Sequence, residues 1–181
     1  MQKIQLFTVG HSNHSAEKFL QLLLQHEIEV LVDIRRFPSS RAFPYFNQDE
    51  LSAALNANGI QYEWITKLGG RRPKVKGFES PNYGLHIDSF RNYADYMLTE
   101  EFQDGMTQLA AIAAVKRTAI MCSESVFWRC HRRLVSDFVV ANGGSVQHIF
   151  PDGRGKPHSM TEGASVDNGV LTYPGPKTLF D

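Results

Sequence analysis

Cysteine is scarce in this chain: its 181 residues contain only Cys122 and Cys130. Two thiols in a chain of this length do not form the framework of a small secreted disulfide-rich domain. Long apolar runs are also missing, which argues against a membrane-spanning helix, and the residues after Met1 lack the apolar core of a signal peptide. These absences predict a cytoplasmic protein that does not associate with membranes.

The formal net charge of the chain is zero. Basic and acidic residues both number 19, so no overall field attracts the chain to nucleic acid or to an anionic membrane. The balance is uneven locally, because the segment Lys67–Lys76 has five basic residues and no acidic one. A basic loop on a neutral protein favours a small anionic ligand over a long polyanion.

The chain has no internal repeat, and its 42% hydrophobic and 21% charged residues are typical of a globular protein. Its length fits one domain that can bury its own core. Apolar periodicity continues to residue 150, whereas residues 151–181 are rich in Gly, Pro and polar side chains. We therefore expect one domain over residues 1–150 and an extension over 151–181, packed on or near it, with little regular structure.

Strand-like and helix-like segments alternate along the first 150 residues. Short apolar runs predict strands at Ile4–Val9, Glu29–Ile34, Ile60–Ile65, Thr118–Met121 and Val146–Phe150. Helical spacing predicts helices at about 16–26, 47–59, 89–97, 100–115 and 127–141. Asn47, with Glu50 three residues later, indicates a capping box. The alternation predicts a three-layer α/β domain, with a mostly parallel sheet of about five strands and helices on both faces.

Polar side chains follow three of the predicted strands at their carboxyl ends. In an open α/β sheet, ligands bind beyond these ends, and parallel strands bring the ends to one edge. The candidate catalytic residues there are Cys122, His11, Asp33 and Glu124. The candidate anion-binding residues, which include part of the basic loop, are Ser12, Arg35, Ser40, Arg41, Gly69, Gly70, Arg71, His131 and Arg132.

Cys122 lies between a buried strand and a loop that leads into a helix. Such a position favours a thiolate, which Arg129 or Arg132 could pair with. The order of strand, cysteine, loop and helix is similar to that of rhodaneses and cysteine phosphatases, but the spacing to Arg129 is one residue longer than in the phosphatases and the loop lacks glycine. Alternatively, Cys122 is a small buried hydrophobe, and the neighbouring Glu124 disfavours a thiolate. Cys130, within a predicted helix, is expected to pack.

Each remaining candidate also has a structural interpretation. His11 is either an acid or base or a helix cap, and Asp33 is either catalytic or the ion-pair partner of a nearby arginine. Ser40 and Arg41 either clamp an anion or belong to a solvated loop. The segment Lys67–Lys76 is either a lid over the site or a simple loop.

A metal site would have to combine the two cysteines with nearby histidines. Adjacent residues of a helix diverge by about 100°, and the usual short-spaced cysteine pairs are missing. We therefore expect neither a metal nor another cofactor, although four ligands are conceivable: Cys122, Cys130, His131 and His11.

Several of these motifs together resemble one family. They are Thr8-Val9-Gly10-His11-Ser12, Val32-Asp33-Ile34-Arg35 with Pro38, Ser40 and Arg41, Leu68-Gly69-Gly70, Met121-Cys122-Ser123-Glu124 and Cys130-His131-Arg132. The chain is identified as resembling the bacterial family called domain of unknown function 488, from about Thr8 to Ile149. Because the resemblance implies no activity, it places the site without naming a reaction.

Three hypotheses for function follow. The first is a cysteine-dependent enzyme that acts on a small anionic or nucleotide-like substrate. The second is a binding module for a nucleotide or a single-stranded nucleic acid, because aromatic side chains accompany the basic loop. In the third, the polar motif only stabilises the fold. We favour the enzyme; the oligomeric state, and whether His158 and Tyr173 of the extension reach the pocket, stay open.

Overall fold

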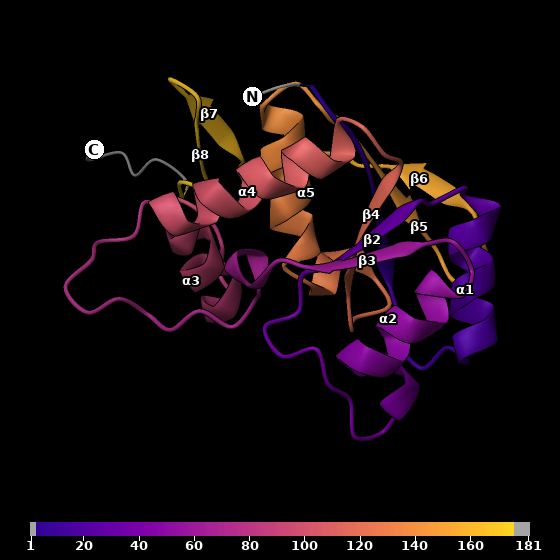
Figure 1. The fold of residues 1–181 in the computed structure, drawn as a ribbon. Helices are drawn as coiled ribbons and strands as arrows, with labels where there is room; N and C mark the ends of the chain where they lie inside the picture. Colours follow the sequence, from indigo (N-terminus) through magenta and orange to yellow (C-terminus); the bar gives the residue numbers. More distant parts are fainter. Residues whose placement is uncertain (1–2, 176–181) are drawn as a thin grey trace.

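A computed structural model describes residues 3–175 of the chain. Its centre is a six-stranded sheet in the order β3-β2-β4-β1-β5-β6, parallel except for the antiparallel β5–β6 pair (Figure 1). The strands are β1 Gln5–Gly10, β2 Val30–Asp33, β3 Gln61–Trp64, β4 Thr118–Cys122, β5 Ser145–Ile149 and β6 Gly155–Pro157. The predicted α/β fold with a mostly parallel sheet is confirmed.

Helices cover both faces of this sheet (Figure 1). They are α1 Ala16–Gln25, α2 Gln48–Asn56, α3 Asp88–Tyr96, α4 Glu100–Ala113 and α5 Arg132–Ala141. One hydrophobic core lies beneath α1 and α2, and the other beneath α3, α4 and α5. None of the helices in the described part of the chain is long and apolar enough to cross a membrane.

β1 separates the two cores because its side chains alternate between the faces. Phe7 and Val9 join the core beneath α1 and α2, whereas Leu6 joins the core beneath α5. Thr8 lies on the α5 side with Leu6, and it is fully buried although it is polar. Its register partner on β5 is His148, which is also buried.

The predicted capping box at Asn47 is wrong. Asn47 precedes α2, but its side chain forms no cap hydrogen bond with that helix. Instead, Asn47 Oδ1 accepts the backbone N–H of Ser40 at 2.7 Å. The Ser40 hydroxyl in turn accepts the backbone N–H of Phe43 at 3.1 Å. Asn47 therefore fixes the loop that follows β2, rather than the helix.

The predicted helix over residues 127–141 is interrupted. A 3₁₀ turn at Phe127–Arg129 is followed by extended backbone at Cys130, with φ −132° and ψ 150°, and α5 then begins at Arg132. The backbone N–H of Arg132 bonds to Cys130 Sγ at 3.4 Å, so the sulfur satisfies one of the free donors at the helix start. Cys130 and His131 thus precede the helix, and the expectation that their side chains diverge was wrong.

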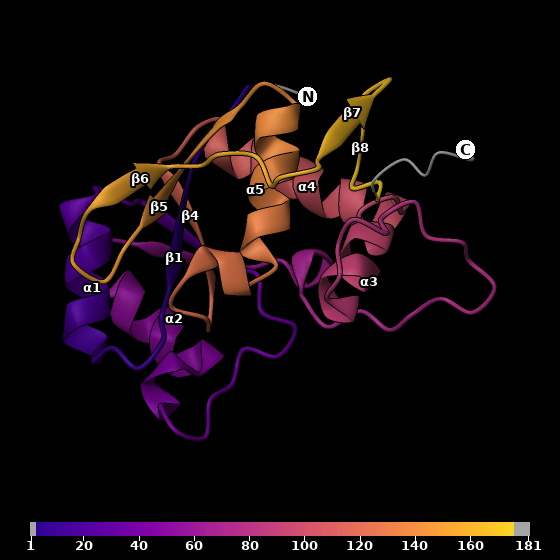
Figure 2. The ribbon, with the colours of Figure 1, turned by 180° about the vertical axis from the view of Figure 1, so that it is seen from behind.

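The extension contains more regular structure than predicted. β6 pairs with β5, and β7 Ser165–Asp167 forms a hairpin with β8 Val170–Thr172. The turn residues Asn168 and Gly169 both have positive φ, 48° and 80°, as a two-residue hairpin turn requires. Figure 2 shows the chain crossing α5 between β6 and the hairpin. Residues 176–181 of the predicted extension lie outside the described residues.

Candidate functional site

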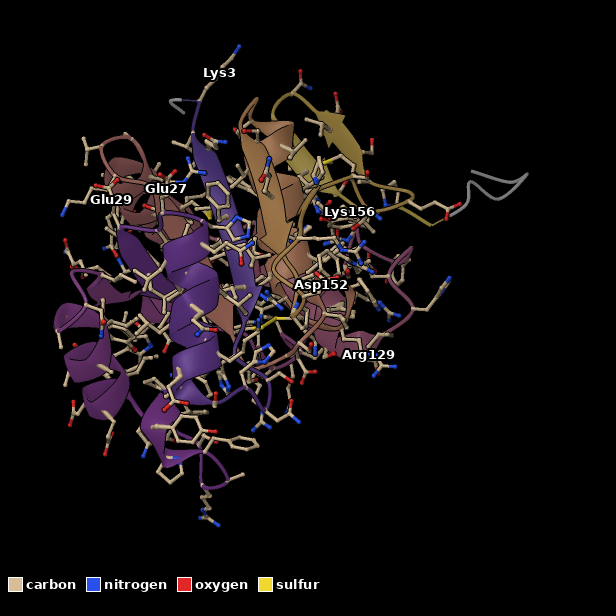
Figure 3. All side chains as sticks on the ribbon, turned by 90° about the vertical axis from the view of Figure 1, so that its right-hand side faces the viewer. Lys3, Glu27, Glu29, Arg129, Asp152 and Lys156 are labelled. Atoms are coloured by element: carbon tan, nitrogen blue, oxygen red, sulfur yellow. A yellow bond between two sulfur atoms is a disulfide. The ribbon has the colours of Figure 1, made fainter. Side chains whose placement is uncertain are left out.

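A cavity of about 570 Å³ lies at the carboxyl ends of β1, β2 and β4. In Figure 3, Lys3, which precedes β1, lies at the top of the view, and Arg129, which lines the cavity, lies in the lower half of the view. The predicted site residues that line the cavity are His11, Arg35, Ser40, Gly70, Arg71, Cys122, Glu124 and His131. Those outside its lining are Ser12, Asp33, Arg41, Gly69 and Arg132.

The cavity wall is rich in positive charge. Four arginines line it, two of which were not among the predicted site residues, and Glu124 is the acidic residue among its lining side chains. Arg36 directly follows the predicted Arg35, whereas the sequence had already indicated Arg129 as a possible partner of the Cys122 thiolate. Phe90 and Tyr93 come from α3, which follows a long loop, so the sequence could not place them at the cavity.

Asp33 and Arg35 form a buried ion pair beside the cavity. The Arg35 Nη2 lies 2.6 Å from Asp33 Oδ2, and the two side chains are 6% and 0% exposed. Asp33 also accepts the backbone N–H of Arg35 at 2.9 Å and the hydroxyl of Tyr62 at 2.8 Å. Burial, and then the negative charge of Asp33, raise the pKa of the Tyr62 hydroxyl, which therefore stays a donor. Of its two sequence interpretations, Asp33 has the geometry of the ion-pair partner.

His11 is held as a neutral imidazole. Its Nδ1 donates to the carbonyl oxygen of Ser12 at 2.9 Å, which leaves Nε2 to accept Arg35 Nη1 at 3.3 Å. Burial, and then the charge of Arg35, lower the pKa of His11 to about 4. The ring also stacks on Phe46 with centroids 4.3 Å apart. At neutral pH His11 therefore accepts a hydrogen bond from Arg35 and has no extra proton to give.

Cys122 lines the cavity and contacts a buried arginine. Its Sγ accepts a hydrogen bond from Arg132 Nε at 3.0 Å. Arg132 is 1% exposed, and burial lowers the pKa of its guanidinium to about 9. Arg132 does not line the cavity, but it donates a hydrogen bond to a sulfur atom that does.

Cys130 brings a second sulfur next to a histidine. Its Sγ lies 3.5 Å from His131 Nδ1, and His131 Nε2 donates to the carbonyl oxygen of Ile34 at 2.9 Å. Burial lowers the pKa of His131 to about 4, so Nδ1 is an unprotonated acceptor. Sequence reasoning missed this pair because it treated Cys130 as part of a helix.

The two cysteines of the chain are bonded to each other through their sulfur atoms. The Sγ atoms of Cys122 and Cys130 are in contact, and Figure 3 shows a sulfur–sulfur bond. Their Cα atoms are 7.5 Å apart, beyond the range of about 4.4–6.8 Å usual for disulfides. Reduction of this bond would free the Cys122 thiol, the form from which a reactive thiolate arises.

Two glycines keep the site compact. A Cβ atom on Gly10 would collide with the carbonyl oxygen of Glu124, and one on Gly70 would lie 2.8 Å from His131 Nδ1. Gly10 therefore lets the loop after Cys122 approach β1, and Gly70 lets the basic loop pack on His131.

Within residues 3–175, no cluster of three or more His, Cys, Asp or Glu side chains has an arrangement that could hold a metal ion.

A comparison with models of known protein families identifies the family of this chain. The family model described as "Domain of unknown function DUF488" matches residues 15–139, more than half of the chain. The chain belongs to the DUF488 family. No curated protein and no solved structure matches it. The DUF488 match includes both cysteines and Arg132, but it ends before His148 and the extension.

Proposed function

We propose that this DUF488 protein is a cysteine-dependent enzyme that acts on a small anionic substrate, with Cys122 as the nucleophile. The observation that carries the proposal is the hydrogen bond from Arg132 Nε to Cys122 Sγ at 3.0 Å. A thiolate is the reactive form of cysteine, and a neighbouring guanidinium stabilises it.

The other contacts of Arg132 support this interpretation. Its acceptors besides the sulfur are the carbonyl oxygens of Glu124 and Ser125, at 2.6 and 3.4 Å, and Thr8 Oγ1 at 3.4 Å. All three are neutral groups. A buried cation favours the charged form of an ionisable acid that it touches, and Cys122 is that acid here.

The cavity supplies the other requirements of the reaction. The arginines on its wall hold the substrate anion close to the sulfur. Once a thiol reductant has opened the Cys122–Cys130 bond by a two-electron reduction, the Cys122 thiolate forms a bond to the electrophilic atom of the substrate, and the leaving group departs with the bonding electron pair. Water then releases the transferred group from sulfur and restores the thiol. Cys130 and His131, 3.5 Å apart, offer an unprotonated nitrogen within the same cavity.

Two alkylating agents of different charge test the proposal. On the reduced native protein, peptide mass spectrometry would give the rates of Cys122 alkylation by iodoacetate, an anion, and by iodoacetamide, which is neutral. We expect the ratio of the iodoacetate rate to the iodoacetamide rate to be about tenfold higher than in urea-unfolded protein, equivalent to about 1.4 kcal/mol of anion attraction. Inorganic phosphate should slow the iodoacetate reaction.

Arginine variants provide the controls for this measurement. Arg71→Gln and Arg129→Gln remove charge from the cavity wall and should lower the ratio. Arg154→Gln removes an 86% exposed arginine outside the cavity and should leave the ratio unchanged. A Cys122 that reacts only after unfolding would mean that the sulfur is part of the core, and the proposal would fail.

A second candidate function is binding of a nucleotide or of single-stranded nucleic acid. Phe37 and Trp128 are 64% and 47% exposed, and each adjoins an arginine of the cavity wall. Bases stack on exposed rings while phosphates meet arginine. This function predicts that binding of a short oligothymidylate weakens steeply with salt and survives Cys122→Ser.

A pair of aromatic variants tests this second candidate. Phe37→Ala should weaken binding by about 1–3 kcal/mol. Tyr83→Ala, which removes a 58% exposed ring outside the cavity lining, should have little effect. Fluorescence anisotropy across a salt titration measures both variants, and affinity independent of salt would exclude phosphate contacts.

A further inference from the structure

A chain of buried hydrogen bonds connects Arg132 to the C-terminal extension. From Arg132 Nη1 it passes to Thr8 Oγ1 at 3.4 Å, and from that hydroxyl to His148 Nδ1 at 2.7 Å. His148 Nε2 lies 2.8 Å from His158 Nδ1, and His158 Nε2 lies 2.8 Å from Asp137 Oδ1. His158 directly follows β6, where the extension begins to cross α5 (Figure 2). We call these four residues, Thr8, His148, His158 and Asp137, the Thr8–Asp137 relay.

The hydrogen bonds of the relay all point in one direction. Because the Asp137 carboxylate only accepts, His158 donates from Nε2 and accepts at Nδ1. His148 must then donate from Nε2 and accept the Thr8 hydroxyl at Nδ1, which leaves the Thr8 oxygen to accept from Arg132. Burial lowers the pKa of His148 to about 3, in agreement with a neutral ring.

The relay joins two opposite charges that would be unfavourable to bury separately. Arg132 is 1% exposed and Asp137 is fully buried, and both belong to α5. A guanidinium at one end and a carboxylate at the other align the three neutral groups between them, and each aligned hydrogen bond strengthens the next. The relay thereby offsets part of the desolvation of both charges.

The relay also contacts the loop between the two cysteines. The ring of Phe127 stacks on His148, with centroids 3.5 Å apart and planes inclined by 4°. Phe127 lies between Cys122 and Cys130 in sequence. The same histidine that helps to hold Arg132 therefore supports the loop that carries the sulfurs.

We propose that His158 is a positioning residue that acts through Arg132 to stabilise the Cys122 thiolate. This inference rests on the proposed function, because it assigns His158 a part in the reactivity of the same sulfur. The described part of the extension does not line the cavity, but through His158 it would contribute to the reactivity of Cys122. Without His158, the Thr8 hydroxyl can rotate away, and Arg132 loses one acceptor and the aligned dipoles that hold it against Cys122.

Other charged and titratable groups surround both ends of this connection. Around Cys122 they are Arg132 from α5, His11 and Arg35 after β1 and β2, Glu124 in the loop, and Cys130 and His131 before α5. Around the relay they are Lys156 from β6, Arg133 from α5, and Tyr173 after β8. Because substitutions in the relay leave the groups around Cys122 in place, a change in the pH profile of Cys122 alkylation reports on the relay.

The pH profile of Cys122 alkylation by iodoacetamide, followed on the reduced full-length protein from pH 5 to 9, tests the inference. His158→Leu interrupts the relay and should slow the reaction about tenfold at pH 6.5, a shift of about one pH unit. His158→Gln should restore the wild-type profile, because its amide can accept from His148 and donate to Asp137. Thr8→Val interrupts the other end with an isosteric side chain, and it serves if His158→Leu does not fold.

Tyr173→Phe is the matched structural control. Its hydroxyl donates to Asp137 Oδ2 at 2.8 Å, so its loss disturbs the same carboxylate without interrupting the relay. Its pH profile should equal that of the wild type even if its melting temperature falls.

The outcomes separate the inference from the proposed function. A wild-type Cys122 that is unreactive below about pH 8.5, the ordinary thiol value, would overturn the proposed function. Wild-type reactivity at pH 6.5 with unchanged profiles in His158→Leu and Thr8→Val would overturn only the relay inference. Equal shifts in His158→Leu and Tyr173→Phe would also overturn it, because the effect would then follow from a loosened fold.

Discussion

Replacing Asp33 with alanine is expected to lower the free energy of unfolding by about 3–5 kcal/mol. The substitution leaves the guanidinium of Arg35, 6% exposed, without its carboxylate partner. It also removes the acceptor for the hydroxyl of Tyr62. The uncompensated charge, more than the lost attraction, is responsible for the size of the effect.

Urea denaturation at pH 7, followed by circular dichroism, measures this loss. Asp104→Ala is the matched control, because its ion pair with Lys67 is at the surface, where Asp104 is 66% exposed. Surface pairs contribute about 0–1 kcal/mol, so the control should remain close to wild type. Equal effects for the two variants would show that the Asp33–Arg35 pair is no more important than a surface pair.

Acidification from pH 7 to 4.5 is expected to lower the free energy of unfolding by several kcal/mol. Burial lowers the pKa of His11 and His131 to about 4 and that of His148 to about 3. In the unfolded chain these side chains bind protons near pH 6.5. Between pH 6.5 and 4, therefore, the unfolded state binds more protons than the folded state, and stability present above pH 6.5 is lost as the pH falls.

Each of these histidines contributes about 2–3 kcal/mol to the loss by pH 4.5. Urea denaturation at pH 7, 5.5 and 4.5 measures the slope. His131→Gln should be less stable at pH 7 but lose about 2 kcal/mol less on acidification. The exposed His86, substituted as His86→Gln, should keep the wild-type slope. A stability that is flat over this interval would contradict the assignment of neutral buried imidazoles.

The position of the site could be predicted from sequence because it follows from topology. Apolar runs located β1, β2 and β4, and the alternation with helices implied that their carboxyl ends meet. His11 and Cys122 were therefore assigned to one edge without any knowledge of side-chain directions. Whether Asp33 pairs with Arg35 or acts in catalysis could not be decided, because both alternatives place a carboxylate at the same strand end.

The parts that sequence did not predict depend on contacts between distant segments. The break at Cys130 depends on its sulfur meeting the backbone of Arg132, which no local propensity signals. The relay needs Thr8 and His148 to be register partners, and His158 to return from the extension. A polar residue inside each of two apolar strands was a signal of such a buried partnership. The Asn168-Gly169 pair is typical of a hairpin turn. It was overlooked because the Gly, Pro and polar content of the extension predicted little regular structure there.

The pairing of β6 with β5 has a consequence for association between copies of the chain. β5 carries buried apolar residues such as Val146 and Ile149, and an open edge on it would be a template for strands of another molecule. β6 covers that edge with three exposed residues. It ends in Pro157, which has no N–H to offer a further strand. Because so short a strand is itself a poor template, β6 protects the sheet from edge-to-edge aggregation.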